Sequence, residues 1–109
     1  MPQVYKILGQ LNPTANSSGS LYTVPASNSA VVSTITIANL SGNTAIYSVN
    51  LRPSGAANAN SQYIAYQAIV PSNDTVALTL GITLSGTDVI QVNANTSLVA
   101  FSAFGSEIY

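Results

Sequence analysis

The chain has 109 residues, of which 47% are hydrophobic and only 5% are charged, and it contains no histidine and no cysteine. A typical soluble domain is roughly 25% charged, so we expect this surface to pack against copies of itself or against other proteins. The absence of cysteine excludes disulfides and thiol chemistry. The two basic residues do not form the patch that nucleic acid or anionic lipid requires, and no apolar run approaches the roughly 20 residues of a membrane span.

Apolar residues recur with a period of two, and Gly, Pro, Asn or Ser interrupt the pattern roughly every 8–12 residues. This pattern predicts an all-β protein, a single β-sandwich of seven to nine strands with jelly-roll or immunoglobulin-like topology. The length is close to the commonest size of one domain, so residues 1–109 are predicted to form a single domain. In chain order, the expected strands are residues 4–11, 21–24, 30–38, 45–52, 62–70, 75–84, 88–93 and 97–104.

Two segments between or before these strands have alternative interpretations. Residues 1–20 form either an ordinary first strand and loop, or an extended N-terminal arm that adds a strand to a neighbouring subunit. Residues 54–62 (SGAANANSQ) are predicted to be a long loop, because Gly and Asn weaken a helix there. Residues 1–6 lack the basic region and apolar stretch of a signal peptide, so we expect synthesis and assembly in a cytoplasm.

Few residues of this chain suit catalysis or metal binding. Without histidine, general acid–base chemistry would need a pair of carboxylates such as Asp74 and Asp88. Each of these follows a turn sequence in which Asp commonly binds its own backbone, so we assign both to turns. We therefore expect no enzymatic activity, no metal and no cofactor.

Arg52 and the tyrosines are candidates for contacts between subunits. Arg52 ends a predicted strand, either as a solvated side chain or paired with Asp74 or Asp88, within a subunit or across an interface. Tyr63 and Tyr66 are three residues apart, so they point to opposite faces if their strand is regular. Core or interface positions suit these rings, and a carbohydrate-binding platform is the alternative.

A resemblance to a known family covers nearly the whole chain and depends on the order of short segments. These are KILGQ (6–10), LYTVP (21–25), AVVSTITIAN (30–39), LRPSGA (51–56), PSNDT (71–75), LGITL (80–84), TDVI (87–90) and FGSEI (104–108). In this order they resemble a family of small bacteriophage virion proteins, common in phages of cyanobacteria and other aquatic bacteria. Ser54 departs from the alanine that is usual in the family. The resemblance implies a structural component of the phage particle.

Composition and resemblance together lead to an expected role on the capsid exterior. We expect a capsid decoration or cement protein that stabilises the head by multivalent contacts with itself, as a homotrimer, and with the major capsid protein. A neck, tail or baseplate accessory protein and a glycan-binding adhesin module are the alternatives. The expected interface residues are Val4, Tyr5, Ile7, Leu8, Arg52, Tyr63, Tyr66, Phe104, Ile108 and Tyr109.

Overall fold

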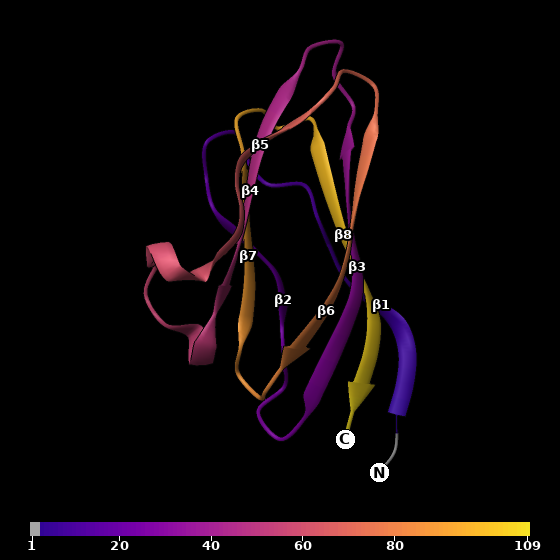
Figure 1. The fold of residues 1–109 in the computed structure, drawn as a ribbon, viewed down its shortest axis with the longest axis vertical. Coiled ribbons are helices and arrows are strands. Elements are labelled where there is room, and N and C mark those ends of the chain that lie inside the picture. The colour runs from indigo at the N-terminus through magenta and orange to yellow at the C-terminus, as the bar shows by residue number, and fades with distance from the viewer. Residues whose placement is uncertain (1–2) are drawn as a thin grey trace.

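A computed structural model describes residues 3–109 and shows eight strands in two four-stranded antiparallel sheets that face each other (Figure 1). The predicted β-sandwich of seven to nine strands is therefore confirmed. The strands are β1 (Gln3–Leu11), β2 (Gly19–Thr23), β3 (Ser29–Asn39), β4 (Ala45–Arg52), β5 (Tyr63–Val70), β6 (Thr75–Leu84), β7 (Val89–Ala94) and β8 (Val99–Ile108). The predicted loop between β4 and β5 contains two short 3-10 turns, η1 (Pro53–Gly55) and η2 (Asn60–Gln62).

The strand order identifies the topology as a jelly roll rather than an immunoglobulin fold. Sheet A has the order β1-β8-β3-β6, and sheet B has the order β2-β7-β4-β5. The first strand in the sequence pairs with the last, the second with the second last, and so on inward. The pairs are β1 with β8, β2 with β7, β3 with β6, and β4 with β5. Successive pairs alternate between the sheets, which is the double Greek-key arrangement of an eight-stranded jelly roll.

The core lies between the sheets and follows the alternation of the sequence. In β3, Val32, Ile35 and Ile37 are fully buried, and the residues between them are more exposed. The ring of Phe101 on β8 meets the ring of Tyr47 on β4 edge to face, with centroids 6.3 Å apart. This contact joins the two sheets, because β8 lies in sheet A and β4 in sheet B.

The loops gather at two opposite ends of the elongated sandwich, which measures 45 × 27 × 20 Å. We call the end at which β1 begins and β8 ends the terminal end (Figure 1). There the loop after β2 meets the loop after β6, since the Thr87 N–H donates to the Val24 carbonyl at 2.9 Å. At the opposite, distal end, the Asn39 N–H donates to the Asp74 carbonyl at 2.9 Å and the Asn16 N–H to the Ala94 carbonyl at 2.8 Å.

Strand β8 extends to Ile108, beyond the predicted end at residue 104, because Gly105 allows it to pass close to β3. A Cβ atom on Gly105 would lie 2.0 Å from the Val31 carbonyl oxygen. The register of sheet A shifts at this level in β1, β3 and β6. The shifts therefore form a line of bulges across the sheet, and Gly105 lies on it.

Candidate functional site

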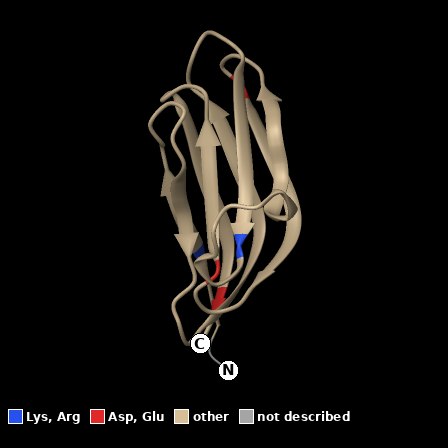
Figure 2. Cartoon of the chain, turned by 90° about the vertical axis from the view of Figure 1, so that its left-hand side faces the viewer, with Lys and Arg blue, Asp and Glu red and all other residues tan. Residues whose placement is uncertain are grey.

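The two aspartates lie at opposite ends of the sandwich, so they do not form a catalytic pair (Figure 2). At the distal end, the Asp74 carboxylate accepts the N–H of Thr75 at 2.8 Å. At the terminal end, the two carboxylate oxygens of Asp88 accept the N–H groups of Ser85 and Ser54, each at 2.9 Å. Both carboxylates therefore bind backbone in turns, and that of Asp88 also fixes the start of the long loop after β4.

Arg52 ends β4 at the terminal end and pairs in the sheet with Val89 of β7. Within residues 3–109 it forms no ion pair with either aspartate, and its buried Nε has no hydrogen-bond partner. The alternatives for Arg52 that remain are a solvated strand end and a contact with another subunit.

A cluster of Lys6, Tyr22 and Glu107 connects β1 and β8 of sheet A to β2 of sheet B. The Glu107 side chain is buried, although its strand ends at the surface. Its Oε2 accepts a hydrogen bond from the Tyr22 hydroxyl at 2.5 Å, and its Oε1 lies 3.0 Å from the Lys6 ammonium. A buried carboxylate is tolerated here because each oxygen has a charged or strongly polar partner.

These contacts shift the ionisation of all three groups. The hydrogen bond from Tyr22, and then that from Lys6, lower the pKa of Glu107 despite its burial. Burial, reinforced by the Glu107 carboxylate, raises the pKa of Tyr22, and the hydrogen bond to Glu107 raises the pKa of Lys6. The cluster is therefore held as a carboxylate, a neutral phenol and an ammonium at neutral pH.

Most of the expected interface residues lie on β1 or at the end of the neighbouring β8, with Tyr109 directly after it. We call this group the terminal surface: Val4, Tyr5, Ile7, Phe104, Ile108 and Tyr109. Tyr5 is 80% exposed and Ile7 is 54% exposed, and Ile7 pairs directly with the half-buried Phe104. Leu8 differs, because it packs against the core. Strand β1 is also an edge strand, so one side of its backbone is unpaired within the chain.

Residues 3–11 thus form part of the sandwich, as the strand β1 at one edge of sheet A. Residues 1 and 2 of the predicted arm lie outside the described residues. Exchange of this strand between subunits stays a prediction.

Tyr63 and Tyr66 point to the same face of sheet B, whereas a regular strand would have placed them on opposite faces. Their rings make an edge-to-face contact with centroids 4.9 Å apart. The strand is not regular, because Asn50 pairs with Tyr63 whereas the adjacent Val49 pairs with Ala65. Ile64 is therefore an extra residue, and this bulge brings residues three apart onto one face.

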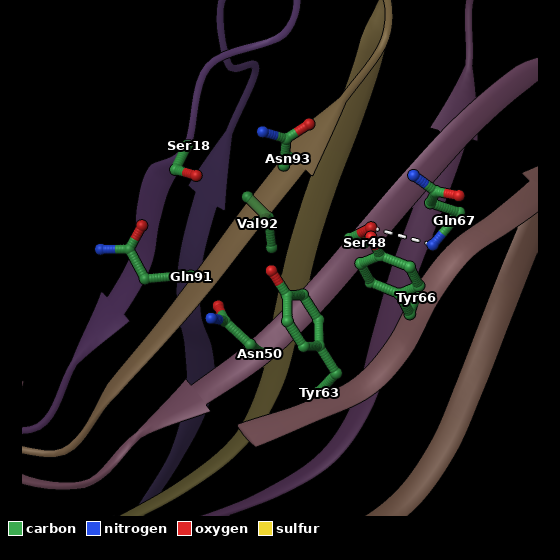
Figure 3. A pocket seen from close by; sticks show the side chains of 9 residues that line it. All are labelled: Ser18, Ser48, Asn50, Tyr63, Tyr66, Gln67, Gln91, Val92 and Asn93. Atoms are coloured by element: carbon green, nitrogen blue, oxygen red, sulfur yellow. Dashed lines mark hydrogen bonds between the residues drawn. The ribbon is translucent and has the colours of Figure 1, made fainter. Parts of the chain in front are cut away.

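The two tyrosines border a polar hollow of about 180 Å³ on the outer face of sheet B (Figure 3). We call it the tyrosine hollow, and its lining is Ser18, Ser48, Asn50, Tyr63, Tyr66, Gln67, Gln91, Val92 and Asn93. The lining contains amides, hydroxyls and phenol rings but no acid and no base. These groups can bind an uncharged polar ligand.

Residues 3–109 contain no group of three or more acidic, His or Cys side chains placed to hold a metal ion. Over the same residues, no helix is long and apolar enough to cross a membrane.

Comparisons with known proteins establish the fold. No protein-family model and no curated protein matches the sequence. The structure is similar to a chain of infectious bursal disease virus, Gx strain, with a TM-score of 0.56 and 8% identity over 97% of this chain and 32% of that chain. The Gt strain of that virus gives a TM-score of 0.52 and 8% identity over 96% of this chain and 31% of that chain.

A pentameric capsid protein isolated from metagenomic phage sequences is similar at a TM-score of 0.41 and 15% identity, over 96% of this chain and 64% of that chain. The chain spans about a third of the bursal disease virus chains that it matches. The eight-stranded sandwich is thus a fold that also occurs in a virus structure.

Sequence reasoning missed the buried carboxylate of Glu107 and the tyrosine hollow. A lone Glu two residues from the end of the sequence gives no signal of burial, and its partner Tyr22 is 85 positions away. The hollow depends on bulges in β5, and no residue pattern in the sequence predicts these bulges. The polar residues at alternate positions of β4 and β7, Ser48 and Asn50 and then Gln91 and Asn93, are the sequence signal that points to its floor.

Proposed function

We propose that the protein is a structural protein of a bacteriophage virion, and within the virion a capsid decoration protein on the outside of the head. The observation that carries the proposal is the eight-stranded jelly roll, which matches a chain of a virus structure over 97% of this chain. The resemblance to small phage virion proteins supports the same role. A chain with only five charged residues also suits a protein that is largely covered in its working state.

The terminal surface is the proposed contact with neighbouring subunits. A standard interface covers roughly 800 Å² on each partner, which is about one-seventh of the 5526 Å² that this chain exposes. The unpaired edge of β1 and the exposed Tyr5 and Ile7 offer both backbone hydrogen bonds and apolar area. We propose that copies associate there, as a homotrimer, and that each copy also contacts the major capsid protein. Repeated weak contacts of this kind add up to firm attachment.

Quantitative mass spectrometry of purified particles tests the location. A decoration protein is expected at a simple fraction of the copy number of the major capsid protein. A few copies per particle would contradict decoration and would favour the alternative, a neck, tail or baseplate accessory protein.

Two isoleucines test the proposed surface. Ile7 and Ile69 are both exposed, at 54% and 64%, and both lie on edge strands, but Ile69 is on β5 of the other sheet. Burying half of an isoleucine side chain contributes about 1 kcal/mol, so Ile7→Ser should weaken each contact roughly fivefold. Ile69→Ser is the matched control and should bind to particles that lack the protein as the wild type does. Equal binding of Ile7→Ser and the wild type would refute the terminal surface.

A further inference from the structure

The floor of the tyrosine hollow is a square of polar side chains on two central strands. In the sheet, Ser48 of β4 pairs with Asn93 of β7, and Asn50 pairs with Gln91. These four face outward, because the residues that alternate with them on β4, Tyr47 and Val49, are buried in the core. An outer face of a β-sandwich is often polar, but here the amides line a concave surface.

The wall of the hollow is held in place by its own hydrogen bonds. The Asn50 amide donates to Asn58 of the long loop at 2.6 Å, and the Asn58 amide donates to the Tyr63 hydroxyl at 3.3 Å. On the other side of Tyr66, the Gln67 N–H donates to the Ser48 hydroxyl oxygen at 2.9 Å. Gln67 has a φ of +50°, a conformation that costs a non-glycine residue energy and that fixes the bulge beside Tyr66. The tyrosines are thus positioned before any ligand binds.

Several polar groups of the hollow are free to bind a ligand. Among residues 3–109, the side chains of Ser18, Gln67 and Asn93 have no hydrogen-bond partner, and all three line the hollow (Figure 3). Amides and hydroxyls supply both donors and acceptors, as the hydroxyl groups of a sugar require. The absence of acids and bases from the lining favours a neutral ligand over a charged one.

The tyrosine pair also borders a second hollow, of about 280 Å³, together with Asn60 of η2. Tyr66 is 63% exposed, so its ring is available to pack against the C–H groups of a sugar ring. Two adjacent hollows that share the same aromatic side chains suit a chain of sugar units better than a single unit.

We propose that the tyrosine hollow and its neighbour bind a short neutral oligosaccharide. One sugar unit lies over the amides of β4 and β7, and the next packs against Tyr66. This inference goes beyond the proposed structural role and does not depend on where the protein lies in a particle. Binding at one site is weak, and it becomes firm when many copies face the same glycan-coated surface.

The test is an array of neutral and sialylated glycans probed with the purified chain, followed by amide-resolved NMR titration of any neutral oligosaccharide that binds. We expect saturable binding of at least one neutral glycan, with shifts at the side-chain amides of Gln67, Gln91 and Asn93. Absence of binding to every neutral glycan at about 10 mM, well above a millimolar dissociation constant, would overturn the proposal. If the surface around Tyr66 binds polypeptides but no glycan, that result would overturn the proposal as well.

Two variants of exposed side chains make the test specific. Tyr66→Ala should weaken binding by about tenfold or more, because one face of the sugar loses its aromatic contact. Ile69→Ala is the matched control, since Ile69 is also highly exposed, at 64%, and lies on the same strand, β5, but lines neither hollow. Both side chains are exposed, so unchanged amide spectra elsewhere verify the fold of each variant. Equal loss in the two variants, or full binding by Tyr66→Ala, would refute the assignment. Failure of glycan binding leaves the particle copy number unaffected, so this result and the virion role are judged separately.

Discussion

Tyr22→Phe removes one hydroxyl group from the cluster that joins the two sheets at the terminal end. The phenol donates to a buried carboxylate, and a hydrogen bond to a charged group contributes about 1.5–3 kcal/mol. The 2.5 Å distance between the Tyr22 and Glu107 oxygens places this bond among the short, charge-assisted ones. We therefore expect the free energy of unfolding at neutral pH to fall by about 2 kcal/mol, with a melting temperature lower by roughly 10 °C.

In acid, Tyr22→Phe should lower the free energy of unfolding by less than it does at neutral pH. Glu107 has a pKa below its ordinary value of 4.5 in the folded state. A lowered pKa contributes stability at pH values above the unfolded pKa, and that contribution is lost as the pH falls through the folded pKa. In acid, once the pH lies below the folded pKa of Glu107, the wild type has lost the charge-assisted part, and the difference from Tyr22→Phe should shrink to about 1 kcal/mol or less.

Urea unfolding followed by circular dichroism at both pH values measures the effect. Tyr47→Phe is the matched control, because Tyr47 is also buried and burial raises its pKa, but its hydroxyl has no hydrogen-bond partner among residues 3–109. Its effect should be small and independent of pH. An equal cost of Tyr22→Phe at neutral and acidic pH, or no cost at either, would refute the role assigned to the Glu107 carboxylate.

Two other positions give contrasting expectations for stability. In thermal melts, Gly105→Ala should lower the free energy of unfolding by about 3 kcal/mol or prevent folding, because the new Cβ atom would collide with the Val31 carbonyl oxygen. Gly81→Ala should leave the stability unchanged or raise it slightly, because a Cβ atom there has no other atom within 4 Å. Asp88→Asn should lower the free energy of unfolding by about 1 kcal/mol, because one amide oxygen replaces the two carboxylate oxygens that accept the N–H groups of Ser54 and Ser85. Limited proteolysis of this variant should show faster cleavage in the long loop between β4 and β5. Asp74→Asn, which affects one local bond, should stay within about 0.5 kcal/mol, and similar effects at the two aspartates would contradict the linking role of Asp88.

The sequence predicted the strands well, because alternation and turn residues are local signals. The segments 45–52 and 75–84 match β4 and β6 at both ends. Two features could not be read from it. Strand order depends on which distant segments pair, and period-two patterns are alike in a jelly roll and an immunoglobulin fold. The faces of Tyr63 and Tyr66 depend on an extra residue in β5, and a bulge reverses every face assignment beyond it.

The position of β8 has a consequence for how the chain acquires its structure during synthesis. In sheet A, β8 lies between β1 and β3, so these two strands have no shared neighbour until residues 99–108 have left the ribosome. Until then β1 and β3 each expose a strand edge that other nascent chains can pair with. The nested pairing also makes most contacts distant in sequence, which slows folding. We expect that sheet A closes only once β8 has emerged, that high expression favours inclusion bodies, and that slower synthesis at lower temperature increases the folded yield.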